Sequence, residues 1–130
     1  MATFENCRSI SRVAAVDLSA LLYHFAVLDS SGNATSGGTT LTAQGVVDGI
    51  VGEAAVAGKA ISLVVPDGGI AKVVCAGAIT AGALVATDAA GFAIALGAGN
   101  GNLAWGRALE TGAASRVIEI HFMFMGQVNA

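Results

Sequence analysis

Short apolar runs alternate with turn signals along most of the chain. The runs occupy residues 60–65, 70–75, 83–87, 92–96 and 117–124, and clusters of Gly, Asp, Ser or Pro separate them. Within the last run, Ile118, Ile120, Phe122 and Phe124 alternate with other side chains, which is the period of a strand with one buried face. Short strands with turn signals every 8–12 residues or so are typical of an all-β fold. The pattern predicts a small Gly/Ala-rich β-barrel or β-sandwich-like domain.

One hairpin is predicted in the middle of the chain. The runs 61–65 and 70–74 flank Pro66-Asp-Gly-Gly69, and glycine supplies the positive φ that a tight turn needs. We therefore expect these two runs to be antiparallel partners.

Two segments do not follow the strand pattern. Leu18, Leu21, Leu22 and Phe25 have helical spacing after Asp17, an N-cap residue type, and predict a single helical turn. The second segment, 46–51, has similar spacing but is interrupted by glycines, each of which costs a helix about 1 kcal/mol relative to Ala. It is predicted to be a loop or an irregular strand.

The chain also matches itself. Asp29-Ser-Ser-Gly32-Asn-Ala34 resembles Asp88-Ala-Ala-Gly91-Phe-Ala93, and Gly52-Glu-Ala54 with Gly58 resembles Gly106-Arg-Ala108 with Gly112. Two interpretations remain open: two duplicated β units that cover each other's edges, or chance matches between Gly- and Ala-rich stretches.

Composition narrows the function classes. Charged residues make up 12% of the chain, the formal net charge is −3 and the mean hydropathy is +0.73, which excludes an intrinsically disordered chain. Six scattered Lys and Arg argue against nucleic acid as a partner. No apolar run approaches the roughly 20 residues of a membrane-spanning helix, and the first residues lack a signal-peptide pattern. We expect a soluble, non-secreted protein with no membrane partner.

Candidate catalytic and metal-binding chemistry is sparse. His24 and His121 stand in no zinc-binding pattern, and the two cysteines, Cys7 and Cys75, fit a reducing compartment without a disulfide framework. The stretch 97–101 lacks the glycine spacing of a dinucleotide-binding loop and is predicted to be a turn. We therefore expect no enzymatic activity, no catalytic residues, no cofactor, no metal and no small-molecule substrate.

The first 16 residues differ in composition from the rest, with more charge and fewer glycines. We divide the chain into an extended N-terminal arm, residues 1–16, and a single β-rich domain, residues 17–130. An arm that is ordered by a partner fits this composition, and so does an ordinary N-terminal edge strand.

Three stretches resemble the small capsid cement, or decoration, proteins of tailed bacteriophages. They are Gly58-Lys-Ala-Ile-Ser-Leu-Val-Val-Pro-Asp-Gly-Gly-Ile-Ala-Lys-Val-Val74, Gly77-Ala-Ile-Thr-Ala-Gly-Ala-Leu-Val-Ala-Thr-Asp-Ala-Ala-Gly91 and Gly106-Arg-Ala-Leu-Glu-Thr-Gly-Ala-Ala-Ser-Arg-Val-Ile-Glu-Ile120. The resemblance rests on Gly, Ala and turn spacing, covers roughly residues 45–120, and fades before Gly45.

The resemblance implies a non-enzymatic structural protein of the virion. Such a protein is made in the host bacterial cytoplasm and binds the outer capsid surface as a homotrimer. It bridges neighbouring subunits of the major capsid protein and stabilises the expanded shell, commonly through an N-terminal arm. The capsid contacts expected here lie in that arm, with Phe4 as an apolar anchor and Arg8 as a charged one: Ala2, Thr3, Phe4, Glu5, Arg8 and Arg12.

Three other interpretations stay open. The chain could be another virion component, such as a head fibre base or a tail accessory protein. It could be a small-molecule-binding or enzymatic β-domain whose site forms between subunits, although convergent titratable residues are lacking. It could also be a free-standing domain with no role in assembly.

Overall fold

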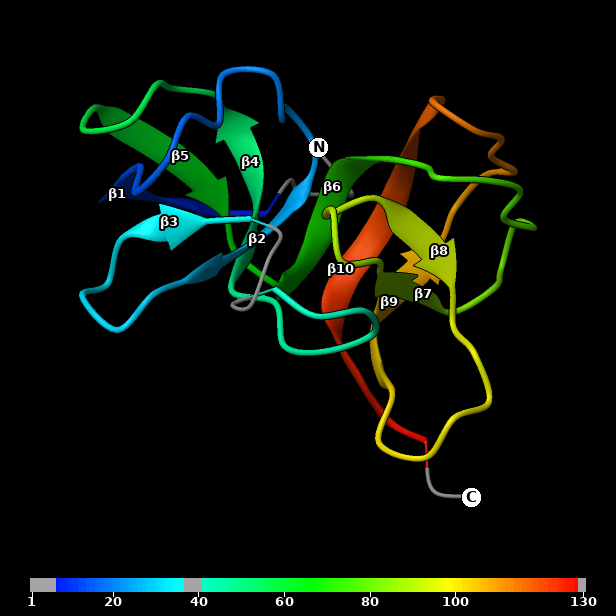
Figure 1. Cartoon of the computed structure of the whole chain (residues 1–130). Coiled ribbons are helices and arrows are strands. Elements are labelled where there is room, and N and C mark those ends of the chain that lie inside the picture. Colours follow the sequence, from blue (N-terminus) through cyan, green and yellow to red (C-terminus); the bar gives the residue numbers. More distant parts are fainter. Residues whose placement is uncertain (1–6, 37–40, 129–130) are drawn as a thin grey trace.

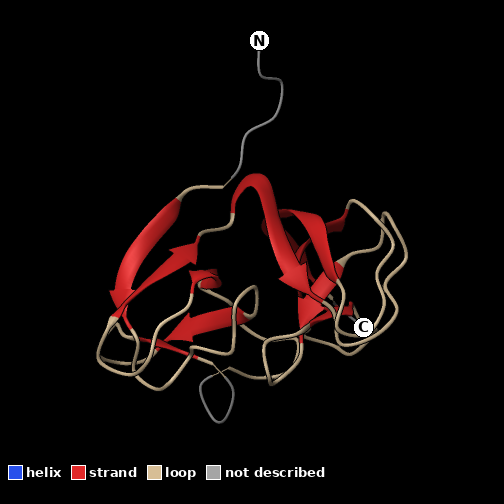
Figure 2. Ribbon diagram, turned by 90° about the horizontal axis from the view of Figure 1, so that it is seen from above, coloured by secondary structure: helices blue, strands red, loops and turns tan. Residues whose placement is uncertain are grey.

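The fold is all-β, as predicted. The computed structural model describes residues 7–36 and 41–128, and in this part of the chain there are strands, turns and loops but no helix (Figure 2). The ten strands are β1 (Ser9–Val13), β2 (Phe25–Leu28), β3 (Ala34–Thr35), β4 (Gly49–Glu53), β5 (Ala60–Val64), β6 (Asp67–Val74), β7 (Val85–Thr87), β8 (Ala93–Ala95), β9 (Leu103–Ala108) and β10 (Val117–Gln127).

The strands form two units that lie side by side (Figure 1). The N unit (β1 to β5) is one sheet of order β1-β5-β4-β2-β3, and the C unit (β6 to β10) contains β6-β10-β9 and the pair β7-β8. A single bridge between Leu84 and Arg107 connects β9 to the start of β7. Within the described residues none of the three sheets closes into a barrel, although a parallel bridge from Ala14 to Ala34 joins the ends of the N-unit sheet at one point.

The two units share one topology, so that each N-unit strand has a counterpart five strands later. Ala14, just after β1, bridges Ala34 on β3, and Cys75, just after β6, bridges Ala93 on β8. The β1–β5, β4–β5 and β2–β4 pairings of the N unit recur as β6–β10, β9–β10 and the Leu84–Arg107 bridge of the C unit. The structure therefore supports the duplication.

The aspartate turns at 29–33 and 88–92 have the same hydrogen bonds. The Oδ1 atoms of Asp29 and Asp88 each accept the backbone N–H groups two and four residues further on, at 2.8–3.0 Å. Gly32 and Gly91 stand at matching places with φ of +80° and +90°, a conformation that favours glycine. The first sequence match thus marks two equivalent hairpins, β2–β3 and β7–β8.

The second sequence match is out of register by three residues. In the structure the counterpart of Gly106 is Gly49, not Gly52. Gly49 has the same position relative to β5 as Gly106 has relative to β10. A Cβ on Gly49 would come within 2.8 Å of the Val64 oxygen, and one on Gly106 within 2.5 Å of the His121 oxygen. Close packing of backbone against backbone explains why both positions are glycine.

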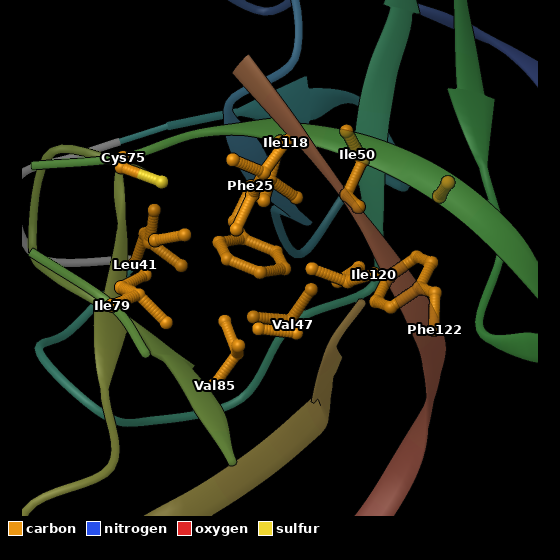
Figure 3. Packing of buried hydrophobic residues seen from close by; sticks show 14 of the residues in the cluster. Phe25, Leu41, Val47, Ile50, Cys75, Ile79, Val85, Ile118, Ile120 and Phe122 are labelled. Carbon is orange, nitrogen blue, oxygen red and sulfur yellow. The ribbon is translucent and has the colours of Figure 1, made fainter. Parts of the chain in front are cut away.

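Two hydrophobic cores follow the duplication. The N-unit core consists of Ala14, Leu18, Ala26, Ala34, Val51, Ile61 and Leu63. The counterparts of all seven lie in the larger cluster: Cys75, Ile79, Val85, Ala93, Ala108, Ile118 and Ile120. That cluster also contains residues from both units that pack between them. The Phe25 ring lies among side chains of both units, with Val47 and Ile50 of the N unit and Ile118 and Ile120 of the C unit around it (Figure 3).

The predicted hairpin of 61–65 and 70–74 is wrong. Both segments are strands, but β5 lies between β1 and β4, and β6 pairs with β10. Because both edges of β5 are already paired, β6 has no edge of β5 to join. The Pro66-Asp-Gly-Gly69 stretch instead carries the chain from the N unit to the C unit.

The predicted helical turn after Asp17 is also absent. Asp17 Oδ1 accepts the Ser19 N–H at 3.0 Å, and single turns follow in which Leu21 N donates to Leu18 O and His24 N to Leu21 O. Leu18 belongs to the N-unit core and Phe25 to the cluster between the units, so the apolar side chains serve two cores rather than one helix face. The segment 46–51 contains the start of β4. The register of this strand shifts between Val51 and Glu53, which agrees with the predicted irregular strand.

Candidate functional site

The expected capsid contacts lie only partly in the described structure. Ala2, Thr3, Phe4 and Glu5 lie outside the described residues. Arg8 and Arg12 are exposed; Arg12 lies on β1, opposite Ile61 of β5, and its Nη1 donates to the Ser11 oxygen at 3.2 Å. The stretch Ser9–Val13 is thus an edge strand of the N-unit sheet, which is the alternative that the composition left open.

The residues just before β1 connect the two units. Cys7 N donates to Ile70 O at 3.2 Å, on β6, and Arg8 N donates to Asp67 Oδ2 at 2.9 Å. Arg8 O in turn accepts the Val65 N–H at 2.9 Å. The bond from Arg8 N is the main reason that the pKa of Asp67 lies below its ordinary value.

A groove of about 250 Å³ lies at this junction. Its polar side chains are Cys7, Tyr23, Lys72 and Glu119, and Lys72 and Glu119 are cross-strand neighbours on β6 and β10. Burial raises the pKa of the Cys7 thiol to about 11, and the neighbouring Asp67 carboxylate adds to the rise. Because the thiolate is the reactive form, this cysteine is a poor nucleophile at neutral pH.

Both histidines bind backbone carbonyl groups. His24 Nδ1 lies 3.1 Å from Ala90 O, and His121 Nε2 lies 2.6 Å from Gly68 O, so the nitrogen in each bond carries the proton. In the ranges 7–36 and 41–128, His, Cys, Asp and Glu side chains form no group of three that could hold a metal ion. No helix in those ranges is long and apolar enough to cross a membrane.

Exposed apolar side chains gather near the end of β10. Phe124 is half exposed and its ring packs against Trp105 of β9 in a tilted arrangement, with centroids 5.1 Å apart. Trp105 Nε1 donates to Gly45 O at 2.9 Å, which brings exposed Val46 close to this pair. The period-two pattern had placed Phe124 on the buried face of the strand, but a register shift between Phe122 and Gly126 turns it outward.

The two units contact each other through backbone hydrogen bonds and a pair of rings. Val74 N donates to Tyr23 O at 3.1 Å, and Phe25 N donates to Gly91 O at 2.7 Å. The His24 and Phe92 rings are 4.3 Å apart between centroids. This contact was not predictable from local sequence patterns, because its residues come from segments far apart along the chain.

Known proteins share this fold but not the sequence. Comparison with protein families and with curated proteins gave no match. Among solved structures, the chain is similar to the N base of the head fiber gp8.5 in bacteriophage phi29. The TM-score is 0.67 at 12% sequence identity, and the similarity covers 88% of this chain and 92% of the other. The two proteins therefore share one fold over nearly their whole compared lengths.

Proposed function

We propose that this chain is a structural protein of a phage virion that binds the outer surface of the capsid. The observation that carries the proposal is the fold similarity to a phage head fibre base, which extends over both units. The cement-protein resemblance of residues 45–120 points to the same kind of particle from the sequence. In this role the chain has no catalytic step, and its work is binding.

Two forms of this role differ in what the bound protein does. As a cement protein, a homotrimer bridges neighbouring major capsid protein subunits and stabilises the expanded shell, because a ligand that binds one state favours that state. As a head fibre base, the protein holds a projecting structure on the shell and need not stabilise it. The fold similarity favours the second form, and the sequence resemblance favours the first.

Co-sedimentation with phage shells tests the proposal. We expect saturable binding to expanded, undecorated shells at a fixed ratio to the major capsid protein, and no binding to unexpanded shells. Heating the decorated shells separates the two forms, because cement raises the temperature of shell disruption and a fibre base leaves it unchanged. Absence of binding to either shell would contradict the proposal.

The N-terminal residues have a prediction of their own. Removing Ala2–Glu5 is expected to leave the fold intact, since these residues precede every described hydrogen bond between the residues before β1 and the C unit. The same truncation is expected to abolish shell binding, because it removes expected capsid contacts. A cut as far as Arg12 is unsuitable, because it removes most of the edge strand β1. Thermal unfolding and co-sedimentation of the shorter truncation measure both effects, and undiminished binding would show that Ala2–Glu5 are not the capsid contact.

A further inference from the structure

The contact between the two units runs head to tail. Each unit has a front surface, which is the free edge of its first strand together with its aspartate turn (29–33 or 88–92). Each also has a back surface, which is the segment that leads into its second strand together with the residue paired with the end of that segment. These are Tyr23–Phe25 with Ile50 in the N unit, and 82–84 with Arg107 in the C unit. Inside the chain, the front surface of the C unit binds the back surface of the N unit. The other front surface and the other back surface are left over.

The left-over front surface is exposed. On β1, Val13 is the counterpart of Val74 and is 45% exposed. In the turn, Gly32 is the counterpart of Gly91. A Cβ on Gly91 would come within 2.6 Å of Phe25 O, whereas one on Gly32 would meet no atom within 4 Å. The N unit thus presents an unoccupied copy of the surface that the C unit has buried.

The left-over back surface is exposed as well. Leu84 is the counterpart of the fully buried Phe25, and it is 38% exposed. Gly82 is the counterpart of Tyr23, because Gly82 N donates to Ala108 O just as Tyr23 N donates to Val51 O. Both have positive φ, +87° and +66°, so their carbonyl groups are presented in the same way.

We propose that a second copy of this chain binds head to tail, with the front surface of its N unit on the back surface of the first copy's C unit. The internal contact specifies the expected hydrogen bonds: Val13 N of one copy to Gly82 O of the other, and Leu84 N of that copy to Gly32 O. A heterologous contact of this kind forms a ring if the rotation closes. Three copies, a number that rests on the proposed function, would form a ring of six units; the contact itself does not depend on that function.

At two positions the residues of the proposed contact between copies differ from those of the internal contact in a way that weakens binding. The counterparts of Val73 and Ile50 are Arg12 and Arg107, and Arg107 Nε already donates to Gly82 O at 3.0 Å. Two guanidinium groups on facing surfaces repel each other, and salt screens this repulsion. The association is therefore expected to strengthen with added salt and in an Arg107→Ile variant.

Cysteine cross-linking tests the contact in the full chain. The internal neighbours His24 and Phe92 correspond to Ala83 and Asn33, so Ala83→Cys and Asn33→Cys are made as separate proteins. Under mild oxidation at high micromolar concentration, a mixture of the two should give a disulfide-linked dimer. Each variant alone should give none beyond the background of the wild type, because a heterologous contact never brings two copies of one position together.

Controls make the result decisive. A mixture of Asn33→Cys with Val46→Cys, an exposed residue outside both surfaces, should stay at background. Adding Gly32→Ala to the Asn33→Cys protein should lower the cross-linked fraction about tenfold, equivalent to about 1.4 kcal/mol, because the new Cβ would meet Leu84 O. No dimer from the mixture, with both thiols reactive toward a maleimide, overturns the proposal, and so does a dimer from one variant alone. Shells are absent from the experiment, so its failure is separate from failure of the proposed function.

Discussion

Phe122→Ala is expected to lower the free energy of unfolding by about 3–5 kcal/mol, the usual cost of removing a buried aromatic ring. The side chain is fully buried on β10, and its ring lies 6.0 Å from that of Phe25 in a tilted arrangement. Because Phe25 belongs to the N unit, the truncation opens a cavity in the packing between the units as well as inside the C unit. Urea denaturation followed by circular dichroism measures the change.

Phe124→Ala is the matched control on the same strand. Phe124 is 51% exposed and its ring packs at a tilt against Trp105, so the expected loss is about 1 kcal/mol, the value of one aromatic pair. Equal losses for the two variants would contradict the burial of the Phe122 ring in the core.

The positions of strands were predictable where the alternation of apolar and polar residues along the chain determines them. Ile118, Ile120 and Phe122 alternate with more exposed residues because one face of β10 covers the C-unit core, and period two reports that directly. Phe124 continues the same alternation in the sequence, yet the register shift after Phe122 turns it to the surface. A bulge of this kind depends on the partner strand, so it leaves no mark on the alternation itself.

Strand pairing was not predictable, because it depends on residues far apart in the chain. Between β5 and β6 the turn residues are typical of a hairpin, but β5 was already paired on both edges. Local turn chemistry shows that the chain turns there, and it does not show which strands meet afterwards. The same limit applies to the front and back surfaces, which only the assembled units define.

The duplication was visible in the sequence only where a position demands one residue type. Asp29 and Asp88 match because each carboxylate binds its own turn. Core positions need only a small or apolar side chain, so Ala14 is matched by Cys75 and Val51 by Ala108. For this reason, similarity between the units survives in their turns and is lost in their cores.

The two equivalent turn glycines give the second large effect. Gly91→Ala is expected to cost about 3 kcal/mol, because a left-handed residue with a Cβ costs about 1–2 kcal/mol and overpacking adds a further 1–3 kcal/mol. The overpacking arises where the new Cβ would approach Phe25 O at 2.6 Å. Gly32→Ala has nearly the same φ and open space around the Cβ, so it should cost only the first part, about 1 kcal/mol.

The difference in stability loss between the two alanine variants therefore measures how closely the C-unit turn at 88–92 packs against the N unit. Chemical denaturation at low protein concentration, where copies do not associate, measures both losses under the same conditions. A Gly91→Ala variant no less stable than Gly32→Ala would mean that the turn at 88–92 is not held against Phe25. In that case the internal contact would also lose its value as the template for binding a second copy.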